Sequence, residues 1–239
     1  MRRVRPLLVF LVVLAGILIV TDRVAAWAAQ RAVADRVAQE LTAYDVRSAP
    51  PEVQFGGFPF LTQVATGEYG HVVLRLRNVG SDQVRLPLVE LTASGVTAPL
   101  TNLVESGPIH AERMTGSATV GYDQVADLAG WPELSLSADN GGLVVRLPAE
   151  VLGTAVTLAG TADVELADGG VWVRVGQLTA DGGGGLPPGS EAVVGQIAAD
   201  LSVHVPLPPL PYGLTLESVR AEPAGIVVTV SSRDVPLSR

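Results

Sequence analysis

The sequence of 239 residues contains no cysteine and no lysine. Without cysteine the protein can form no disulfide, no thiolate nucleophile and no cysteine-based metal site. Without lysine it has neither a Schiff-base amine nor a P-loop lysine, so all sixteen basic residues are arginines. The exclusive use of arginine is what a GC-rich genome produces, and by itself it indicates no function.

Histidine is scarce as well. The three histidines, His71, His110 and His204, are far apart in sequence, and none has a neighbour at metal-ligand spacing. The chain has no H-E-x-x-H and no G-x-S-x-G motif, and the four glycines at 182–185 lack the Gly-Lys-Ser/Thr of a phosphate-binding loop. We therefore expect no catalytic site, no metal and no cofactor. A hydrolase with an unrecognised site that uses one of the histidines is an alternative.

Charge is distributed unevenly along the chain. Arg2, Arg3 and Arg5 precede every acidic residue, and all twenty-four acidic residues lie from Asp22 onward, which makes the body distinctly acidic. A basic face for nucleic acid is therefore not expected. Apolar residues make up 48% of the chain but aromatic residues only 5%. This composition, dominated by Val, Leu and Ala, indicates a β-rich globular domain rather than a disordered chain.

An apolar run of fourteen residues, Leu7–Val20, follows the N-terminal arginines. It spans about 21 Å as a helix, short of the hydrocarbon core of about 30 Å, which favours a signal peptide over a full membrane span. Small-residue cleavage sites occur at 24–26 and 26–28. Residues 1–26 are expected to be a signal peptide or an N-terminal membrane anchor, and in both cases the positive-inside rule places residues 22–239 outside the cytoplasm.

A helical pattern covers residues 22–44. Its apolar residues recur three or four positions apart, while Arg31 with Asp35 and Arg36 with Glu40 form i,i+4 pairs on the other side. We expect a helix that packs on the core; the alternative is that its small-residue face lines a cavity. The apolar positions are Ala26, Ala29, Val33, Val37, Leu41 and Tyr44.

The remainder, up to residue 239, alternates as β-strands separated by turns, several of them Gly-rich as hairpins require. We expect one domain over 27–239, with short helices at 123–129 and 191–201, the second capped by Ser190. The Pro-rich stretch 205–214 is expected to be a rigid structural crossover rather than an adaptor ligand. The predicted strands are 52–55, 68–79, 83–96, 109–122, 134–138, 143–147, 154–166, 171–178, 215–221 and 226–231.

The stretch Phe55–Gly67 holds three of the four phenylalanines within six residues. Gly56 and Gly57 permit backbone angles that other residues avoid, and Pro59 fixes φ. We expect a sharp bend that the flanking aromatic rings clamp onto the core. Direct contact with a ligand is the alternative role.

Two motifs carry a resemblance to a known family. The run Gly-Phe-Pro-Phe-Leu-Thr-Gln at 57–63, followed by Gly67, and the tail Leu-Pro-Tyr-Gly-Leu at 210–214 resemble the LmeA-like phospholipid-binding family of actinobacterial cell-envelope proteins, over essentially 22–235. The resemblance implies a non-enzymatic envelope or periplasmic protein that binds phospholipid, of the phosphatidylinositol type, and supports the assembly of mannosylated lipids. The fold it implies is α+β, a strongly twisted antiparallel sheet curled around a long N-terminal helix, akin to the tubular lipid-binding proteins.

A sheet rich in Val and Leu, with few aromatic rings to fill it, can leave an apolar groove beside the helix. Each acyl methylene buried in such a groove contributes about 0.8 kcal/mol, and arginines at the rim would select the headgroup. The expected partners are phospholipid and the membrane surface; the alternative is a scaffolding envelope protein held by its N-terminus. The candidate lipid-binding residues are Val33, Val37, Leu41, Phe58, Phe60, Leu74, Arg75 and Arg77.

Overall fold

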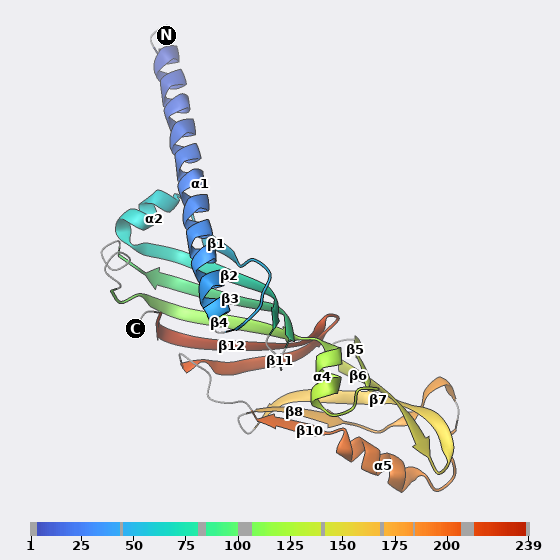
Figure 1. Ribbon diagram of the computed structural model, residues 1–239. Helices are drawn as coiled ribbons and strands as arrows, with labels where there is room; N and C mark the ends of the chain where they lie inside the picture. The colour runs from blue at the N-terminus through green and yellow to red at the C-terminus, as the bar shows by residue number, and fades with distance from the viewer. Residues whose placement is uncertain are drawn as a thin grey trace. The chain divides into compact units, whose positions relative to one another are not determined.

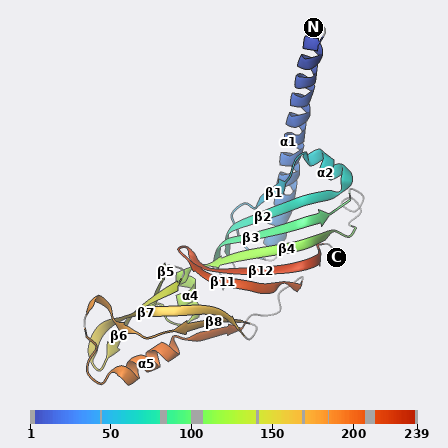
Figure 2. The same cartoon turned by 180° about the vertical axis from the view of Figure 1, so that it is seen from behind.

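A computed structural model describes residues 4–43, 45–80, 85–99, 107–139, 142–167, 170–183, 185–206 and 213–237. The fold has one long N-terminal helix and two six-stranded antiparallel sheets (Figures 1 and 2). The α+β class, the long helix and the twisted antiparallel strands expected from the sequence are therefore confirmed. The strands form two sheets rather than one, and these sheets are twisted but not curled.

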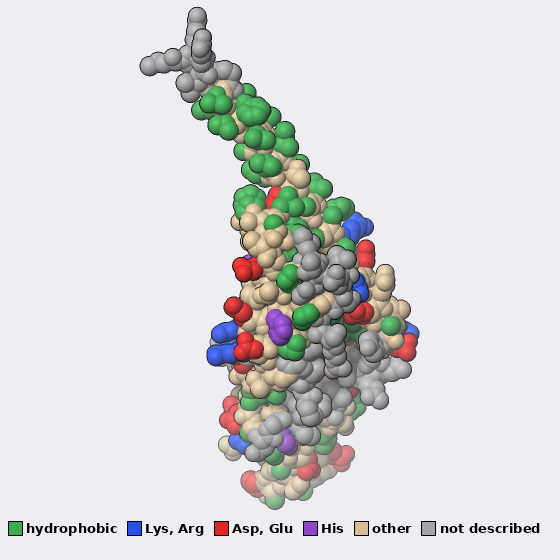
Figure 3. Space-filling view, turned by 90° about the vertical axis from the view of Figure 1, so that its left-hand side faces the viewer, with side chains coloured by type: hydrophobic (Ala, Val, Ile, Leu, Met, Phe, Trp, Pro, Cys, Tyr) green, Lys and Arg blue, Asp and Glu red, His purple; other side chains and the backbone are tan. Residues whose placement is uncertain are grey.

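Helix α1 (Val4–Ala43) joins the apolar run and the predicted helix in one continuous element of 40 residues. Every side chain of the apolar run is exposed, and the projecting part of the helix is covered by apolar side chains in Figure 3. Views from opposite sides place the other end of α1 over one face of the strands β1 to β4 (Figures 1 and 2). In the described part of the chain, this is the one helix long and apolar enough to cross a membrane.

The first sheet has the strand order β1-β2-β3-β4-β12-β11. Strand β1 pairs with β2 so that Val53 lies opposite Leu74 and Phe55 opposite Val72. Alternate residues of a strand point to the same face, so these apolar side chains share the face that carries Phe55 toward the core. The strands are β1 (Glu52–Gly56), β2 (Glu68–Gly80), β3 (Arg85–Thr97), β4 (His110–Val120), β11 (Thr215–Glu222) and β12 (Gly225–Pro236).

The second sheet has the order β10-β8-β7-β6-β5, with β9 paired to β7. The two predicted hairpins, β5 with β6 and β7 with β8, are confirmed as antiparallel pairs. Helices α4 (Tyr122–Leu128) and α5 (Glu191–Asp200) confirm the two short helices expected from the sequence. The strands are β5 (Ser135–Asp139), β6 (Gly142–Val151), β7 (Thr154–Ala167), β8 (Gly170–Val175), β9 (Thr179–Ala180) and β10 (Val203–Pro206), and a short 3₁₀ turn, η1, covers Asp181–Gly183.

Ser190 does not cap α5 as the sequence suggested. It occupies the N-cap position, but its hydroxyl makes no capping hydrogen bond. Its φ of −83° and ψ of −5° are helical, whereas a capping side chain needs an extended backbone to reach the free N–H groups. The predicted crossover at 205–214 falls largely on residues 207–212, which lie outside the described residues.

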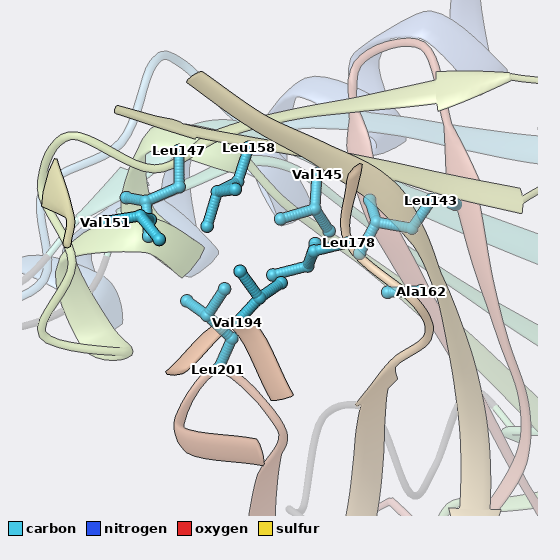
Figure 4. Packing of buried hydrophobic residues seen from close by; sticks show 10 residues of the cluster. Leu143, Val145, Leu147, Val151, Leu158, Ala162, Leu178, Val194 and Leu201 are labelled. Carbon is cyan, nitrogen blue, oxygen red and sulfur yellow. The ribbon is translucent and has the colours of Figure 1, made fainter. Parts of the chain in front are cut away.

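The chain divides into two compact units, and each has its own core. Unit 1 comprises residues 1–77, 90–115 and 232–239; unit 2 comprises 78–89 and 116–231. In unit 2, leucines and valines of β6 and β7 point toward Val194 of α5 and toward Leu201, which follows this helix (Figure 4). In unit 1, the core is built around Ala26, Phe60 and Tyr69. The single domain expected over 27–239 stays a prediction.

Candidate functional site

The stretch Phe55–Gly67 contains a short helix as well as the expected bend. Gly57 has φ of +95°, the Phe58–Pro59 peptide is cis, and helix α2 (Phe60–Thr66) follows at once. Gly67 ends this helix with φ of +73°, and its N–H donates to the carbonyl oxygen of Gln63 at 2.8 Å. The sequence did not predict α2, because seven residues preceded by a proline carry no local N-cap signal.

The phenylalanines of this stretch fall into two groups. The rings of Phe55, Phe60 and Tyr69 form a cluster with centroid distances of 5.3, 5.8 and 6.3 Å. Ala26 of α1 belongs to the same core, and Phe60 is only 5% exposed. These rings confirm that the bend is clamped onto the core.

Phe58 lies outside that cluster. It is 61% exposed, and the guanidinium carbon of Arg23 sits 5.0 Å from the centre of its ring. Leu61, in the first turn of α2, is 41% exposed. The bend therefore buries Phe60 and leaves Phe58 and Leu61 on the surface.

Asp22 of α1 provides the N-cap that α2 lacks locally. Its side chain is buried, with 3% of the residue exposed, and Oδ1 accepts a hydrogen bond from the N–H of Leu61 at 2.8 Å. Its Oδ2 accepts a second from Arg23 at 2.8 Å. A carboxylate at a helix N-terminus satisfies free N–H groups and meets the positive end of the helix dipole. Sequence reasoning missed this contact, although an acidic residue two positions after an apolar run was a signal.

The inner side of α1 changes character along its length. Ala25, Ala26 and Ala29 pack into the core of unit 1, where their small side chains allow close approach. Farther along, Val33 is 40% exposed, and both Val37 and Leu41 are half-buried. The three predicted residues of α1 thus keep part of their apolar surface accessible. Helix α1 contacts β1.

On β2, the structure gives each predicted arginine an acidic partner. Leu74 is half-buried on the face shared with Val72. Arg75 forms an ion pair with Glu90, whose hydrogen bond and negative charge raise the pKa of Arg75 above its usual value. The guanidinium of Arg77 lies 3.3 Å from a carboxylate oxygen of Glu52, and both side chains are exposed. An anionic headgroup at this rim would compete with two carboxylates.

The eight predicted lipid-binding residues therefore all lie in unit 1. Of these eight residues, Phe60 is buried, and the other seven retain accessible surface.

The three histidines lie in different surroundings. His71 covers Gly56 across the β1–β2 pair, where any larger side chain would overlap its imidazole ring. His204 stacks on Trp172 at 4.5 Å in unit 2, whereas His110 is an exposed residue at the start of β4 in unit 1. Among the described residues, no group of three or more His, Asp or Glu side chains could hold a metal ion.

Two surface hollows lie in unit 2. One, of about 270 Å³, is lined by Leu143, Glu165 and Arg220 among others, and the second, of about 400 Å³, lies beside Glu133 and Val156. Neither contains a predicted lipid-binding residue. The first is smaller than most ligand pockets, which measure roughly 300 to 1,000 Å³.

Comparison with known proteins gives one match. A model of the LmeA-like phospholipid-binding family matches residues 20–231. No curated protein and no solved structure matches the chain significantly. The matched range begins at the last residue of the apolar run and includes residues of both units.

Proposed function

The chain belongs to the LmeA-like phospholipid-binding family, and on this premise we propose that it binds a phospholipid without changing it chemically. The single observation that carries the proposal is the family match over residues 20–231. The match includes the inner side of α1, the Phe55–Gly67 bend and β2.

The accessible apolar surface of unit 1 supports a place for the acyl chains. Val33, Val37 and Leu41 leave apolar surface uncovered on α1, and Leu74 does so on β2. We assign acyl-chain contact to these four residues. Phe60 is assigned a supporting role, because its buried ring holds the bend and β2 against α1.

The headgroup is assigned to Arg75 and Arg77. A guanidinium donates two parallel hydrogen bonds to a phosphate, which suits an anionic headgroup. Arg77 is the more available of the two, because its 3.3 Å pair with Glu52 is exposed and such pairs stabilise by about 1 kcal/mol or less. A phosphatidylinositol-type lipid is the proposed class, and support of envelope glycolipid assembly is the proposed role.

The proposed location is the outer face of the plasma membrane, with α1 retained as an anchor. Cleavage at 24–26 or 26–28 would remove Asp22 and with it the cap of α2. Both cleavages would also remove Ala26 from the core. Residues 22–26 are thus part of the folded unit, which favours an uncleaved N-terminus.

Photocrosslinking tests the proposal and separates lipid binding from simple anchoring. The full chain is reconstituted in vesicles that contain phosphatidylinositol with a diazirine on one acyl chain. After illumination, the crosslinked residues are mapped by mass spectrometry. We expect adducts within 33–41 and 72–76, in addition to those on the apolar run Leu7–Val20.

Adducts confined to residues 4–21 would contradict the proposal, because they would show anchoring alone. A parallel sample with diazirine-labelled phosphatidylglycerol tests the lipid class: equal labelling within 33–41 would contradict the preference for inositol. Val33→Asp is the variant to compare with the unchanged chain. It places a charge on the proposed acyl-chain surface, at a position that is already 40% exposed.

A further inference from the structure

The apolar run of α1 is too short for the membrane it would enter. Leu7–Val20 spans about 21 Å, and the hydrocarbon core measures about 30 Å. A span this short is accommodated by thinning the bilayer or by flanking residues that extend the apolar surface. In the sequence, Asp22 and Arg23 follow the run after Thr21, and two charged residues would end the apolar surface there.

The structure encloses the carboxylate of Asp22 and places the guanidinium of Arg23, whose side chain is 53% exposed, against an aromatic ring. Asp22 is 3% exposed, because α2 covers it and donates the N–H of Leu61 to its carboxylate. Arg23 folds over the ring of Phe58, with its guanidinium carbon 5.0 Å from the ring centre. The first charged position after the run is therefore enclosed, and the second lies on an aromatic face.

Apolar side chains continue beyond the run on the surface. Val24 is 59% exposed and Trp27 58% on α1, while Phe58 and Leu61 are exposed at 61% and 41% on the bend and α2. From Leu7 to Trp27 the helix measures about 31 Å, which equals the thickness of the hydrocarbon core. We call Val24, Trp27, Phe58 and Leu61 the collar.

We propose that the collar is a membrane-docking surface, which enters the outer interface of the bilayer that holds α1 and so completes the span. The partner that contacts the collar is bilayer lipid, and Phe58 takes part in this contact. Asp22 fastens α2 to α1, so the collar and the anchor move as one piece. The inference rests on the anchoring of α1 and not on which phospholipid the protein carries.

Two features favour a bilayer over a protein partner. Val24 and Trp27 of the collar follow the exposed apolar side chains of the run on the same helix. Both of its aromatic rings carry an arginine: Arg23 lies over Phe58, and Arg31 lies 5.4 Å from the centre of Trp27. Aromatic rings with adjacent cations are typical of the headgroup level, where the ring meets apolar chains and the guanidinium meets phosphate.

Because the chain has no cysteine, a single introduced cysteine can carry a fluorescent NBD label. Phe58→Cys and Leu61→Cys place the label on the collar. Leu152→Cys is the matched control, since Leu152 is 57% exposed on the turn between β6 and β7. Each full-length variant is reconstituted in vesicles of phosphatidylglycerol and phosphatidylethanolamine, and both dithionite reduction and quenching by doxyl-labelled lipid are measured.

Labels at 58 and 61 are expected to emit at shorter wavelength, to be quenched by doxyl lipid and to be reduced several-fold more slowly than the label at 152. Equal reduction rates at the three positions would overturn the proposal. Protection at 58 and 61 without quenching by lipid would also overturn it, because it would identify a protein partner or a second copy. In the unlabelled chain, brominated lipid is expected to quench the fluorescence of Trp27, and this quenching should be lost in Trp27→Phe. This test needs no cysteine variant.

Discussion

The carboxylate of Asp22 accepts a hydrogen bond of 2.8 Å from the backbone N–H of Leu61, 39 residues along the chain. This contact joins the helix that carries the apolar run to the short helix α2. The N-cap residue of α2, Pro59, has no side-chain group that could cap it, so the capping function comes from α1. The position of Phe58 and Leu61 beside the apolar run follows from this bond.

Removal of the Asp22 carboxylate should release α2. In Asp22→Ala, the N–H of Leu61 loses its acceptor, and a partly buried donor without a partner destabilises the fold. We expect faster amide hydrogen exchange at residues 60–67 and a thermal midpoint lower by a few degrees. Asp35→Ala removes an exposed carboxylate from the same helix and serves as the control. Equal exchange rates in the two variants would show that Asp22 does not hold α2.

The two neighbouring phenylalanines should differ in their effect on stability. Phe60→Ala removes a buried ring from the aromatic cluster and should cost about 3 kcal/mol or more of the free energy of unfolding. Phe58→Ala should cost less than about 1 kcal/mol, because it removes one exposed cation–π contact. Urea unfolding of both variants measures the difference. A loss at Phe58 as large as that at Phe60 would refute the division of the bend into inner and outer faces.

Gly67 should tolerate no side chain. Its φ of +73° disfavours other residues, and an added Cβ would lie 2.8 Å from the Cα of Pro99. We expect Gly67→Ala to lower the free energy of unfolding by about 1 to 3 kcal/mol. Gly70→Ala, three residues on, meets nothing within 4 Å and should be nearly neutral. Similar losses in both variants would indicate that strand propensity rather than backbone strain decides the effect.

Alkaline pH should destabilise unit 1 through Tyr69. Burial raises the pKa of this phenol above the ordinary value of 10.0, so the folded state favours the neutral form. The stabilisation is fully present below pH 10 and is lost as the pH rises through the raised pKa. Thermal midpoints of the wild type should therefore fall above pH 10 more steeply than those of Tyr69→Phe. Parallel curves for the two proteins would contradict this assignment.

Headgroup selection should depend on Arg77. Arg77→Gln removes the exposed guanidinium that we assign to the phosphate, so crosslinking to diazirine-labelled phosphatidylinositol within 33–41 should fall several-fold. Arg113→Gln, an exposed arginine of β4, is the charge-matched control. If both variants crosslink as the wild type does, the headgroup does not bind at Arg77.

Sequence patterns anticipated most of the elements. The alternation of apolar and charged residues predicted β2, the Gly-rich loops predicted the antiparallel hairpins of the second sheet, and the three- and four-residue spacing predicted the lower part of α1. These signals are local, because each depends on residues a few positions apart. The motif around Phe58 also carried the family resemblance that the match over residues 20–231 confirms.

The sequence by itself thus determined the α+β class, the apolar run, the strands and the family. Tertiary structure alone decided that the strands form two sheets, that Phe60 is buried while Phe58 is exposed, and that Asp22 is enclosed instead of ending the apolar surface. The reason is that each of these depends on contacts between residues far apart in the chain. Hydrophobic periodicity records only which face of an element is apolar. Packing decides which other element covers that face, and which element covers a buried carboxylate.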